Sequence, residues 1–214
     1  MSHILIGLDR DNTLIRDSGY LGRDDSWKRQ LEFCQGVVDG LKILKSNPRF
    51  KIIVATNQAG VALGYFPPER TDEINRTIDD LLRDNGVVLD GWYSCPYVGK
   101  DYATERGIPL DSQWVKETDM RKPGIGMLRQ AASDLKLYWD KLTREGKIFF
   151  IGDKPSDVET GLNAKGYGIF VPMPGIPDSE FRKVHRLAKE NQGRVHIDLN
   201  FSKASQRIIN LVKD

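Results

Sequence analysis

Short apolar runs alternate along this chain with longer segments in which apolar residues recur every three or four positions. The runs end at glycine or polar residues and predict buried strands, whereas the helical spacing predicts amphipathic helices. Strands are predicted at 4–6, 51–55, 87–93, 147–151 and 168–171, with a further short run at 195–199. Helices are predicted at 37–46, 67–85, 124–137, 155–164, 181–190 and 202–212.

This order of elements favours a parallel sheet, because consecutive parallel strands are joined by right-handed crossover helices. We therefore expect an α/β fold with a single parallel sheet and helices on both of its faces. At 214 residues the chain is long enough for one sizeable domain. We place the core of that single domain, 1–214, at 3–172 and a C-terminal extension at 173–214.

Two long irregular stretches interrupt the alternation. Residues 16–35 are polar and rich in glycine and aromatic residues, and residues 94–119 show no clear period. Loops of this length are usually functional or mobile, so we expect both to cover a site. Neither is long enough to form an independent α/β cap, which would need a core of its own.

The overall charge narrows the choice of partner. The chain has 32 basic and 30 acidic residues, a net charge of +2, which gives no general nucleic-acid footprint. Two cysteines, Cys34 and Cys95, stand in unlike contexts and indicate a reducing compartment. With no leader segment and no membrane-length apolar run, we expect a soluble, cytoplasmic and monomeric protein.

The polar residues that follow the predicted strands carry the candidate chemistry. Asp9 and Asp11 follow the first strand and point to the same side, so they repel each other unless a cation lies between them. Mg²⁺ suits such an oxygen-rich corner. Since the carboxyl ends of parallel strands share one edge, four clusters can converge there. They are Asp9/Asp11/Thr13, Thr56/Asn57/Gln58, Arg121/Lys122 and Asp153/Lys154/Asp157.

Hydrolysis of a phosphate monoester needs such a set of groups. Asp9 is the candidate nucleophile, forming an aspartyl-phosphate, and Asp11 the acid that later becomes the base. Thr56 and the backbone N–H groups after it would hold phosphate oxygens, and Lys122 would neutralise charge. The predicted Mg²⁺ ligands are Asp9, the Asp11 carbonyl and Asp153, whereas Thr13 and Asp157 would support the site indirectly, Asp157 by capping the following helix.

These four clusters resemble, in order and in strand context, the four motifs of the haloacid dehalogenase (HAD) superfamily of phosphatases. Further motifs, Asp17-x-Gly19-Tyr20 and Cys95-Pro96 among them, are similar to the D-glycero-D-manno-heptose-1,7-bisphosphate 7-phosphatase and histidinol-phosphate phosphatase subfamily. The resemblance implies a capless, Rossmann-like, HAD-like core. It also implies that the following residues contact substrate: Asp17, Gly19, Tyr20, Asn57, Gln58, Arg121 and Lys154.

The chain departs from that subfamily in two places. Asn12 stands where the family usually has glycine, and asparagine tolerates a left-handed backbone. The subfamily typically carries a zinc loop with Cys and His ligands, but here Cys95 has no such companions. One cysteine cannot build a tetrahedral site, so we expect no zinc.

These residues are compatible with three functions. The leading one is a Mg²⁺-dependent phosphatase acting on a phosphorylated sugar, such as heptose 1,7-bisphosphate, or a similar small metabolite. Residues 121–127 and 56–60 also resemble the phosphatase domain of polynucleotide 3'-phosphatases, although the near-neutral charge disfavours a nucleic acid. A non-enzymatic phospho-acceptor of the receiver type is a third reading, and the second carboxylate at Asp11 argues for turnover instead.

Overall fold

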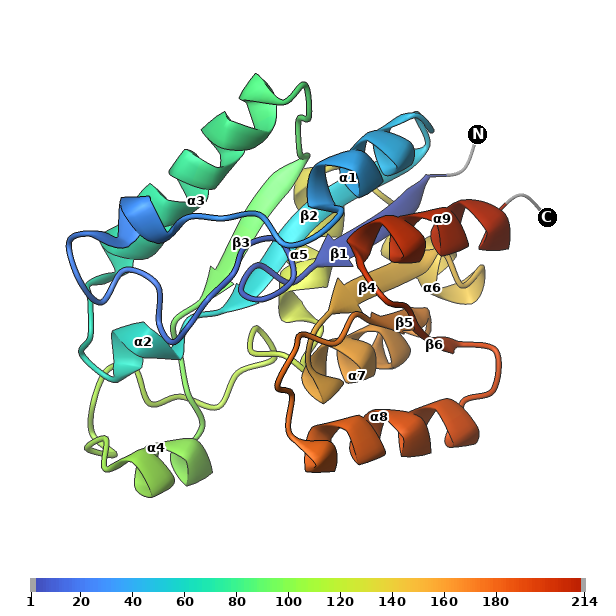
Figure 1. Cartoon of the computed structure of the whole chain (residues 1–214). Helices are drawn as coiled ribbons and strands as arrows, with labels where there is room; N and C mark the ends of the chain where they lie inside the picture. Colours follow the sequence, from blue (N-terminus) through green and yellow to red (C-terminus); the bar gives the residue numbers. More distant parts are fainter. Residues whose placement is uncertain (1–2, 213–214) are drawn as a thin grey trace.

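The protein is described here by a computed structural model covering residues 3–212 (Figure 1). Six parallel strands form one sheet in the order β3-β2-β1-β4-β5-β6, which confirms the predicted fold class. The order reverses between β1 and β4, the position at which open α/β sheets bind ligands. The strands are β1 (Ile4–Leu8), β2 (Phe50–Asn57), β3 (Gly91–Cys95), β4 (Ile148–Gly152), β5 (Tyr167–Phe170) and β6 (Val195–Ile197).

Strand β1 lies at the centre of the sheet. It pairs with β2 on one side and β4 on the other, and all five of its residues are buried. Ile4, Ile6 and Leu8 belong to one hydrophobic cluster, and Leu5 belongs to a second on the opposite face. Burial on both faces is the reason that this strand reads as an uninterrupted apolar run.

Helices cover both faces of the sheet (Figure 1). One face packs against α1 (Val37–Lys45), α3 (Pro68–Asp84) and α9 (Phe201–Leu211). The other packs against α5 (Gly126–Asp134), α6 (Trp139–Arg144) and α7 (Pro155–Asn163), and α8 (Asp178–Glu190) lies beside α7 against β5 and β6. This is the doubly wound arrangement that alternating strands and helices predict.

The structure corrects several predicted bounds. The third strand begins at Gly91, not at 87, because Val87 and Leu89 are buried without joining the sheet. The helix predicted from 124 to about 137 or beyond ends at Asp134 as α5, and the left-handed backbone of Lys136, with φ 55°, separates it from α6, which begins at Trp139. The elements that were not predicted include the 3-10 helix η1 (Trp27–Gln30) and α2 (Ala59–Ala62).

Both irregular stretches lie at the carboxyl edge of the sheet and neither forms a separate cap. Residues 94–119 contain α4 (Lys100–Arg106), which the sequence did not predict. Val98, Ala103 and Ile108 from this stretch pack against α2 in a small satellite cluster. The other stretch, 16–35, is anchored by Trp27, whose side chain is buried in the main core.

The division into a core at 3–172 and an extension at 173–214 stays a prediction. Strand β6 pairs with β5, and α9 packs against α1, so the C-terminal elements continue the same layers. In the part of the chain that the structure describes, no helix is both long and apolar enough to cross a membrane.

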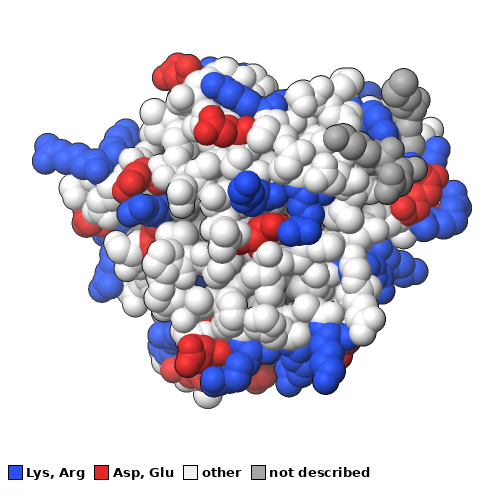
Figure 2. Space-filling view, turned by 45° about the vertical axis from the view of Figure 1, so that its right-hand side comes forward, with Lys and Arg blue, Asp and Glu red and all other residues white. Residues whose placement is uncertain are grey.

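Charged side chains are spread over the surface. On the face shown in Figure 2, Lys and Arg side chains are interspersed with Asp and Glu, and neither sign covers a continuous area. A net charge of +2 distributed in this way produces no extended single-sign field on that face.

We expect Gly7→Ala to destabilise the protein by about 1–3 kcal/mol, because β1 has no room for a side chain there. A Cβ on Gly7 would lie 2.6 Å from Phe150 Cδ2 and 2.9 Å from Leu128 Cδ2. Urea unfolding measures the change in free energy. If the clash with Phe150 is the cause, Phe150→Leu should lower the free energy of unfolding less in the Gly7→Ala protein than in the parent protein. A Gly7→Ala protein as stable as the parent would contradict the packing described here.

Candidate active site

The carboxyl ends of β1, β2 and β4 open into a pocket of about 640 Å³. Both irregular stretches contribute to its wall, as expected from their position over the sheet edge. It is lined by Asp9, Arg10, Asp11, Asn12, Asp17, Ser18, Gly19, Tyr20, Leu21, Asn57, Gln58, Ala59, Gly60, Tyr102, Arg106, Arg121, Lys122, Lys154, Ser156, Asp157 and Glu180.

Asp9 follows the last residue of β1 and lies at the base of this pocket. Its backbone N–H donates to the Ile151 carbonyl of β4 at 2.9 Å, which continues the sheet pairing past the strand end. Its Oδ1 accepts a hydrogen bond from Lys122 Nζ at 2.6 Å. Burial raises the pKa of Asp9 to about 6, although the Lys122 ammonium acts in the opposite direction.

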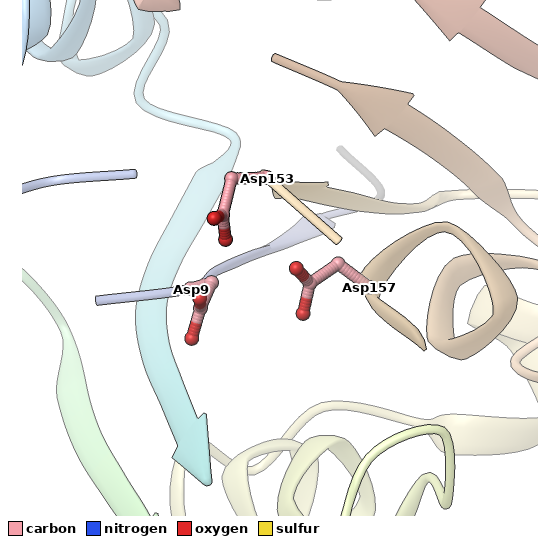
Figure 3. A group of neighbouring side chains, drawn as sticks. All are labelled: Asp9, Asp153 and Asp157. Carbon is pink, nitrogen blue, oxygen red and sulfur yellow. The ribbon is translucent and has the colours of Figure 1, made fainter. Parts of the chain in front are cut away.

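Three buried carboxylates meet at this point. Asp9, Asp153 and Asp157 each place an oxygen within 4.8 Å of the other two, and Figure 3 shows their carboxylates around a common space. Asp153 follows β4, and Asp157 lies in the first turn of α7. Lys122 Nζ also pairs with Asp157 Oδ1 at 2.7 Å. One ammonium group therefore faces three carboxylates.

Asp153 is the member of the group without a partner. Its Oδ1 is buried and has no hydrogen-bond partner among residues 3–212. Burial and then the carboxylates of Asp9 and Asp157 raise the pKa of Asp153 to about 9. A divalent cation with oxygen ligands would satisfy this orphaned oxygen and relieve the repulsion, so the residues present fit Mg²⁺.

Asp157 is engaged on both of its oxygens. Oδ1 pairs with Lys122, and Oδ2 accepts the backbone N–H of Lys154 at 3.0 Å, which caps α7 as the sequence analysis expected. Gly152 makes the close approach possible, because a Cβ there would collide with the Asp157 carboxylate. These contacts suit a supporting role for Asp157.

Asp11 points toward a different set of partners. Arg10 binds it with two hydrogen bonds, Nε to Oδ1 at 2.9 Å and Nη2 to Oδ2 at 3.1 Å. Gln58 Nε2 donates to Asp11 Oδ2 at 2.7 Å. Burial alone would raise the pKa of Asp11, but the Arg10 charge and these hydrogen bonds outweigh it and lower the pKa.

The end of β2 holds these side chains in place. Thr56 is fully buried, and its hydroxyl accepts from Gln58 Nε2 at 2.8 Å, so it lies behind the pocket wall and does not line it. Asn57 clamps the main chain of Lys122: its Oδ1 accepts the Lys122 N–H at 3.0 Å, and its Nδ2 donates to the Lys122 carbonyl at 3.1 Å. Asn57 therefore fixes the lysine that faces the carboxylates.

Asp17 builds a turn at the rim of the pocket. Its carboxylate accepts the backbone N–H groups of Gly19, Tyr20 and Leu21. Within this turn Tyr20 has φ 59°, a left-handed conformation that is rare for a bulky residue. Burial, and then the nearby Asp11 charge, raise the pKa of Asp17.

Two predicted substrate contacts, Arg121 and Lys154, line the pocket from different segments. Arg121 Nη1 donates to the Tyr97 carbonyl at 3.2 Å. Burial by itself would lower the pKa of Lys154, but the carboxylates of Asp153 and Asp9 outweigh it and raise the pKa. Thr13 is buried behind the first motif, and its hydroxyl has no partner within the described ranges.

Several lining residues received no role from the sequence, among them Arg10, Asn12, Tyr102, Arg106 and Glu180. Only Asn12 gave a signal, and its left-handed φ of 61° agrees with the expectation for that position. Cys95 is buried, with its Sγ 3.8 Å from the Tyr97 carbonyl oxygen. The absence of zinc stays a prediction.

Comparison with known sequences identifies the family. A model of the polynucleotide kinase 3 phosphatase family matches residues 4–206. Two curated relatives, from Haemophilus influenzae and Pasteurella multocida, are named D-glycero-beta-D-manno-heptose-1,7-bisphosphate 7-phosphatase. The first is 34% identical over 160 residues, 75% of this chain and 76% of the relative. The second is 34% identical over 175 residues, 82% of this chain and 84% of the relative.

Solved structures show the same fold. The D,D-heptose 1,7-bisphosphate phosphatase of B. bronchiseptica, complexed with magnesium and phosphate, has a TM-score of 0.69 at 20% identity and covers 99% of this chain and 100% of its own. L-2-haloacid dehalogenase from Xanthobacter autotrophicus has a TM-score of 0.54 at 8% identity, and the match covers 98% of this chain and 100% of the dehalogenase chain. The resemblance drawn from the four motifs is confirmed: the chain belongs to the polynucleotide kinase 3 phosphatase family, is a phosphatase, and has the fold of the haloacid dehalogenases.

Proposed function

We propose that the protein is a Mg²⁺-dependent phosphatase that acts on a phosphorylated sugar, with heptose 1,7-bisphosphate as the leading candidate. The observation that carries this proposal is the position of Asp9, which lines the pocket and belongs to the buried carboxylate cluster beside Lys122. The names of the relatives from Haemophilus influenzae and Pasteurella multocida support the choice of substrate.

The cluster also identifies the residues that would hold the metal. We assign the ion to Asp9, Asp153 and the main-chain carbonyl of Asp11, while Asp157 keeps its contacts with Lys122 and the start of α7. When bound, Mg²⁺ offsets the carboxylate charge and polarises the phosphoryl oxygens. The magnesium and phosphate in the B. bronchiseptica structure support the choice of Mg²⁺ as the metal.

The reaction then follows from the residues around the pocket. A carboxylate oxygen of Asp9 attacks the phosphorus, the bond from phosphorus to the leaving oxygen breaks, and Asp11 gives that oxygen a proton. Asp11, now ionised, takes a proton from a water molecule that attacks the phosphorus of the aspartyl-phosphate. Cleavage of the acyl phosphate bond releases phosphate and restores Asp9. Lys122 stays charged throughout, because the carboxylates of Asp157 and Asp9 outweigh the effect of burial and raise its pKa.

Asp11 must leave its present partners to act as the acid. Its pairing with Arg10 favours the ionised form, which cannot donate a proton. We assign proton delivery to a conformer in which the Asp11 carboxyl turns from Arg10 toward the pocket, where it faces the substrate oxygen. Gln58 and Thr56, which both donate hydrogen bonds to Asp11 Oδ2, would guide that movement.

A second candidate is hydrolysis of a 3'-phosphate at the end of a nucleic acid. The match to the polynucleotide kinase 3 phosphatase family favours it, and a site without a cap can admit a large substrate. The near-neutral net charge of +2 disfavours it, because nucleic-acid binding draws on an excess of basic side chains. The two candidates share the chemistry at Asp9 and differ in what binds the rest of the substrate.

Phosphate release with Mg²⁺ tests the proposal directly. We expect heptose 1,7-bisphosphate to give a higher kcat/KM than a 3'-phosphorylated oligonucleotide, and Asp9→Asn to abolish release from both. The variant keeps the volume of the side chain and removes the nucleophile, so its circular dichroism should match that of the parent. Turnover of the oligonucleotide alone would select the second candidate, and full activity of Asp9→Asn would refute the mechanism.

Metal binding can be measured without turnover. We expect Mg²⁺ to raise the melting temperature of the parent protein and to have little effect on Asp153→Asn, because that change removes the unpartnered carboxylate oxygen. Asp84→Asn, at an exposed position of α3, is the matched control and should respond like the parent. An Asp153→Asn protein that Mg²⁺ stabilises as fully as the parent would exclude Asp153 as a ligand.

The effect of replacing Asp11 should depend on the leaving group of the substrate. We expect Asp11→Asn to lower kcat/KM roughly 10²–10⁴-fold for an alkyl phosphate, whose leaving oxygen needs a proton. An aryl phosphate leaves with little protonation, so the loss should be much smaller. Steady-state kinetics with both substrates makes the comparison. Equal losses would mean that Asp11 serves the structure or the metal.

A further inference from the structure

Four side chains from different segments gather on the wall of the pocket that the irregular stretches form: Tyr20, Tyr102, Arg106 and Arg121. We propose that Arg106 of α4 is a specificity-determining residue, which binds an anionic group of the substrate other than the phosphate that is hydrolysed. The Tyr102 ring holds its guanidinium beside the pocket. This inference rests on the proposed function, since it names the residue that binds the part of the proposed substrate that does not react.

The contacts of Tyr102 bring the cluster together. The Arg121 guanidinium carbon lies 5.2 Å from the centroid of its ring, and the Arg106 guanidinium carbon lies 5.6 Å from it. Its hydroxyl lies 3.3 Å from the hydroxyl of Tyr20, within hydrogen-bond distance. One ring therefore orients two guanidinium groups through cation–π contacts and joins the two irregular stretches across the pocket.

Neither guanidinium has an acidic partner. Within residues 3–212, Arg106 and Arg121 form no ion pair, whereas Arg10, the third arginine that lines the pocket, pairs with Asp11. Arg121 is also partly buried, and burial lowers its pKa. A cation partly removed from water without a counter-ion, as Arg121 is, favours the binding of an anion, and the exposed Arg106 adds a second cation beside the same ring. Guanidinium groups suit phosphate, because their fork of N–H donors matches two of its oxygens.

The segments that carry the cluster are fixed before any substrate binds. The Asp17 carboxylate accepts three backbone N–H groups and so holds the left-handed backbone at Tyr20. The rings of Tyr65 and Tyr20 pack together, with their centroids 4.9 Å apart. Helix α4 is anchored by Ala103 in the satellite cluster. Strain held by a turn in this way is typical of a binding site.

Arg106 comes from a different segment from the residues of the reacting centre. Asp9, Lys122 and Asp153 lie at the ends of the strands or in the segments that follow them, whereas Arg106 comes from the helix inserted after β3. The pocket that contains both is about 640 Å³, which is within the usual range for a small-molecule site. A sugar that carries two phosphates can then present one to Asp9 and the other to Arg106.

The test compares two ligands that differ by one phosphate, heptose 1,7-bisphosphate and heptose 7-phosphate. We expect Arg106→Ala to raise KM for the bisphosphate roughly 3- to 10-fold with little change in kcat, and to leave heptose 7-phosphate and an aryl phosphate unchanged. Arg106→Lys should restore part of the loss, and Tyr102→Leu should resemble Arg106→Ala more closely than Tyr102→Phe does.

Arg129→Ala is the matched control. Its guanidinium also lies over an aromatic ring, 5.9 Å from the Trp139 centroid, but it does not line the pocket. We expect this variant to keep the parent KM for both ligands. A loss of the same size in Arg129→Ala, or an equal effect of Arg106→Ala on all three substrates, would overturn the inference.

Binding measured in the Asp9→Asn background separates this inference from the proposed function. If the parent releases no phosphate from either heptose, but Arg106→Ala weakens binding of the bisphosphate alone, the proposed substrate fails and the role of Arg106 stands. If turnover is normal and Arg106→Ala changes neither KM nor binding, the function stands and the inference fails. Equal affinity of the Asp9→Asn protein for the two ligands, or no binding of either, would also overturn it.

Discussion

Three carboxylates are buried together at the carboxyl ends of β1 and β4, and the two ammonium groups near them, Lys122 and Lys154, do not balance their charge. Lys122 pairs with Asp9 and Asp157, which leaves Asp153 with a raised pKa and an unpartnered oxygen. Such a group persists only because the surrounding sheet and helices over-determine its position. The arrangement is unfavourable for the protein alone and suited to a cation, so it indicates function more strongly than any single motif does.

The parallel sheet supplies the rigidity that this cluster needs. Asp9 and Asp153 follow neighbouring strands whose residues are buried, and Asp157 approaches the second strand end because Gly152 has no side chain. Lys122 comes from a segment without regular structure, and the amide of Asn57 holds its backbone from the end of β2. Each charged group is therefore tied to a strand, directly or through one hydrogen-bonded neighbour, and the geometry does not depend on mobile loops.

The features that could be predicted from the sequence are those that depend on apolar periodicity and on the order of strands and helices along the chain. The clusters at Asp9, Thr56 and Asp153 could be placed together because the carboxyl ends of parallel strands share an edge. The clamp of Asn57 on Lys122 could not be predicted, since it joins main-chain atoms 65 positions away. Helix α4 was missed because it is seven residues long and buries only Ala103, which leaves no amphipathic period. The pairing of Arg10 with Asp11 likewise left no pattern to read.

Chemistry and selectivity consequently belong to different parts of the molecule. The carboxylates and Lys122 are buried among strand ends, where a change in any one disturbs the charge balance of the others. The cations of α4 lie on an insertion that is anchored by a small satellite cluster and makes no ladder contact with the sheet. Since α4 faces the pocket without touching the carboxylates, its side chains can vary at little expense to the reacting groups. An enzyme built in this way can change its substrate through the insertion while the sheet edge keeps the same reaction.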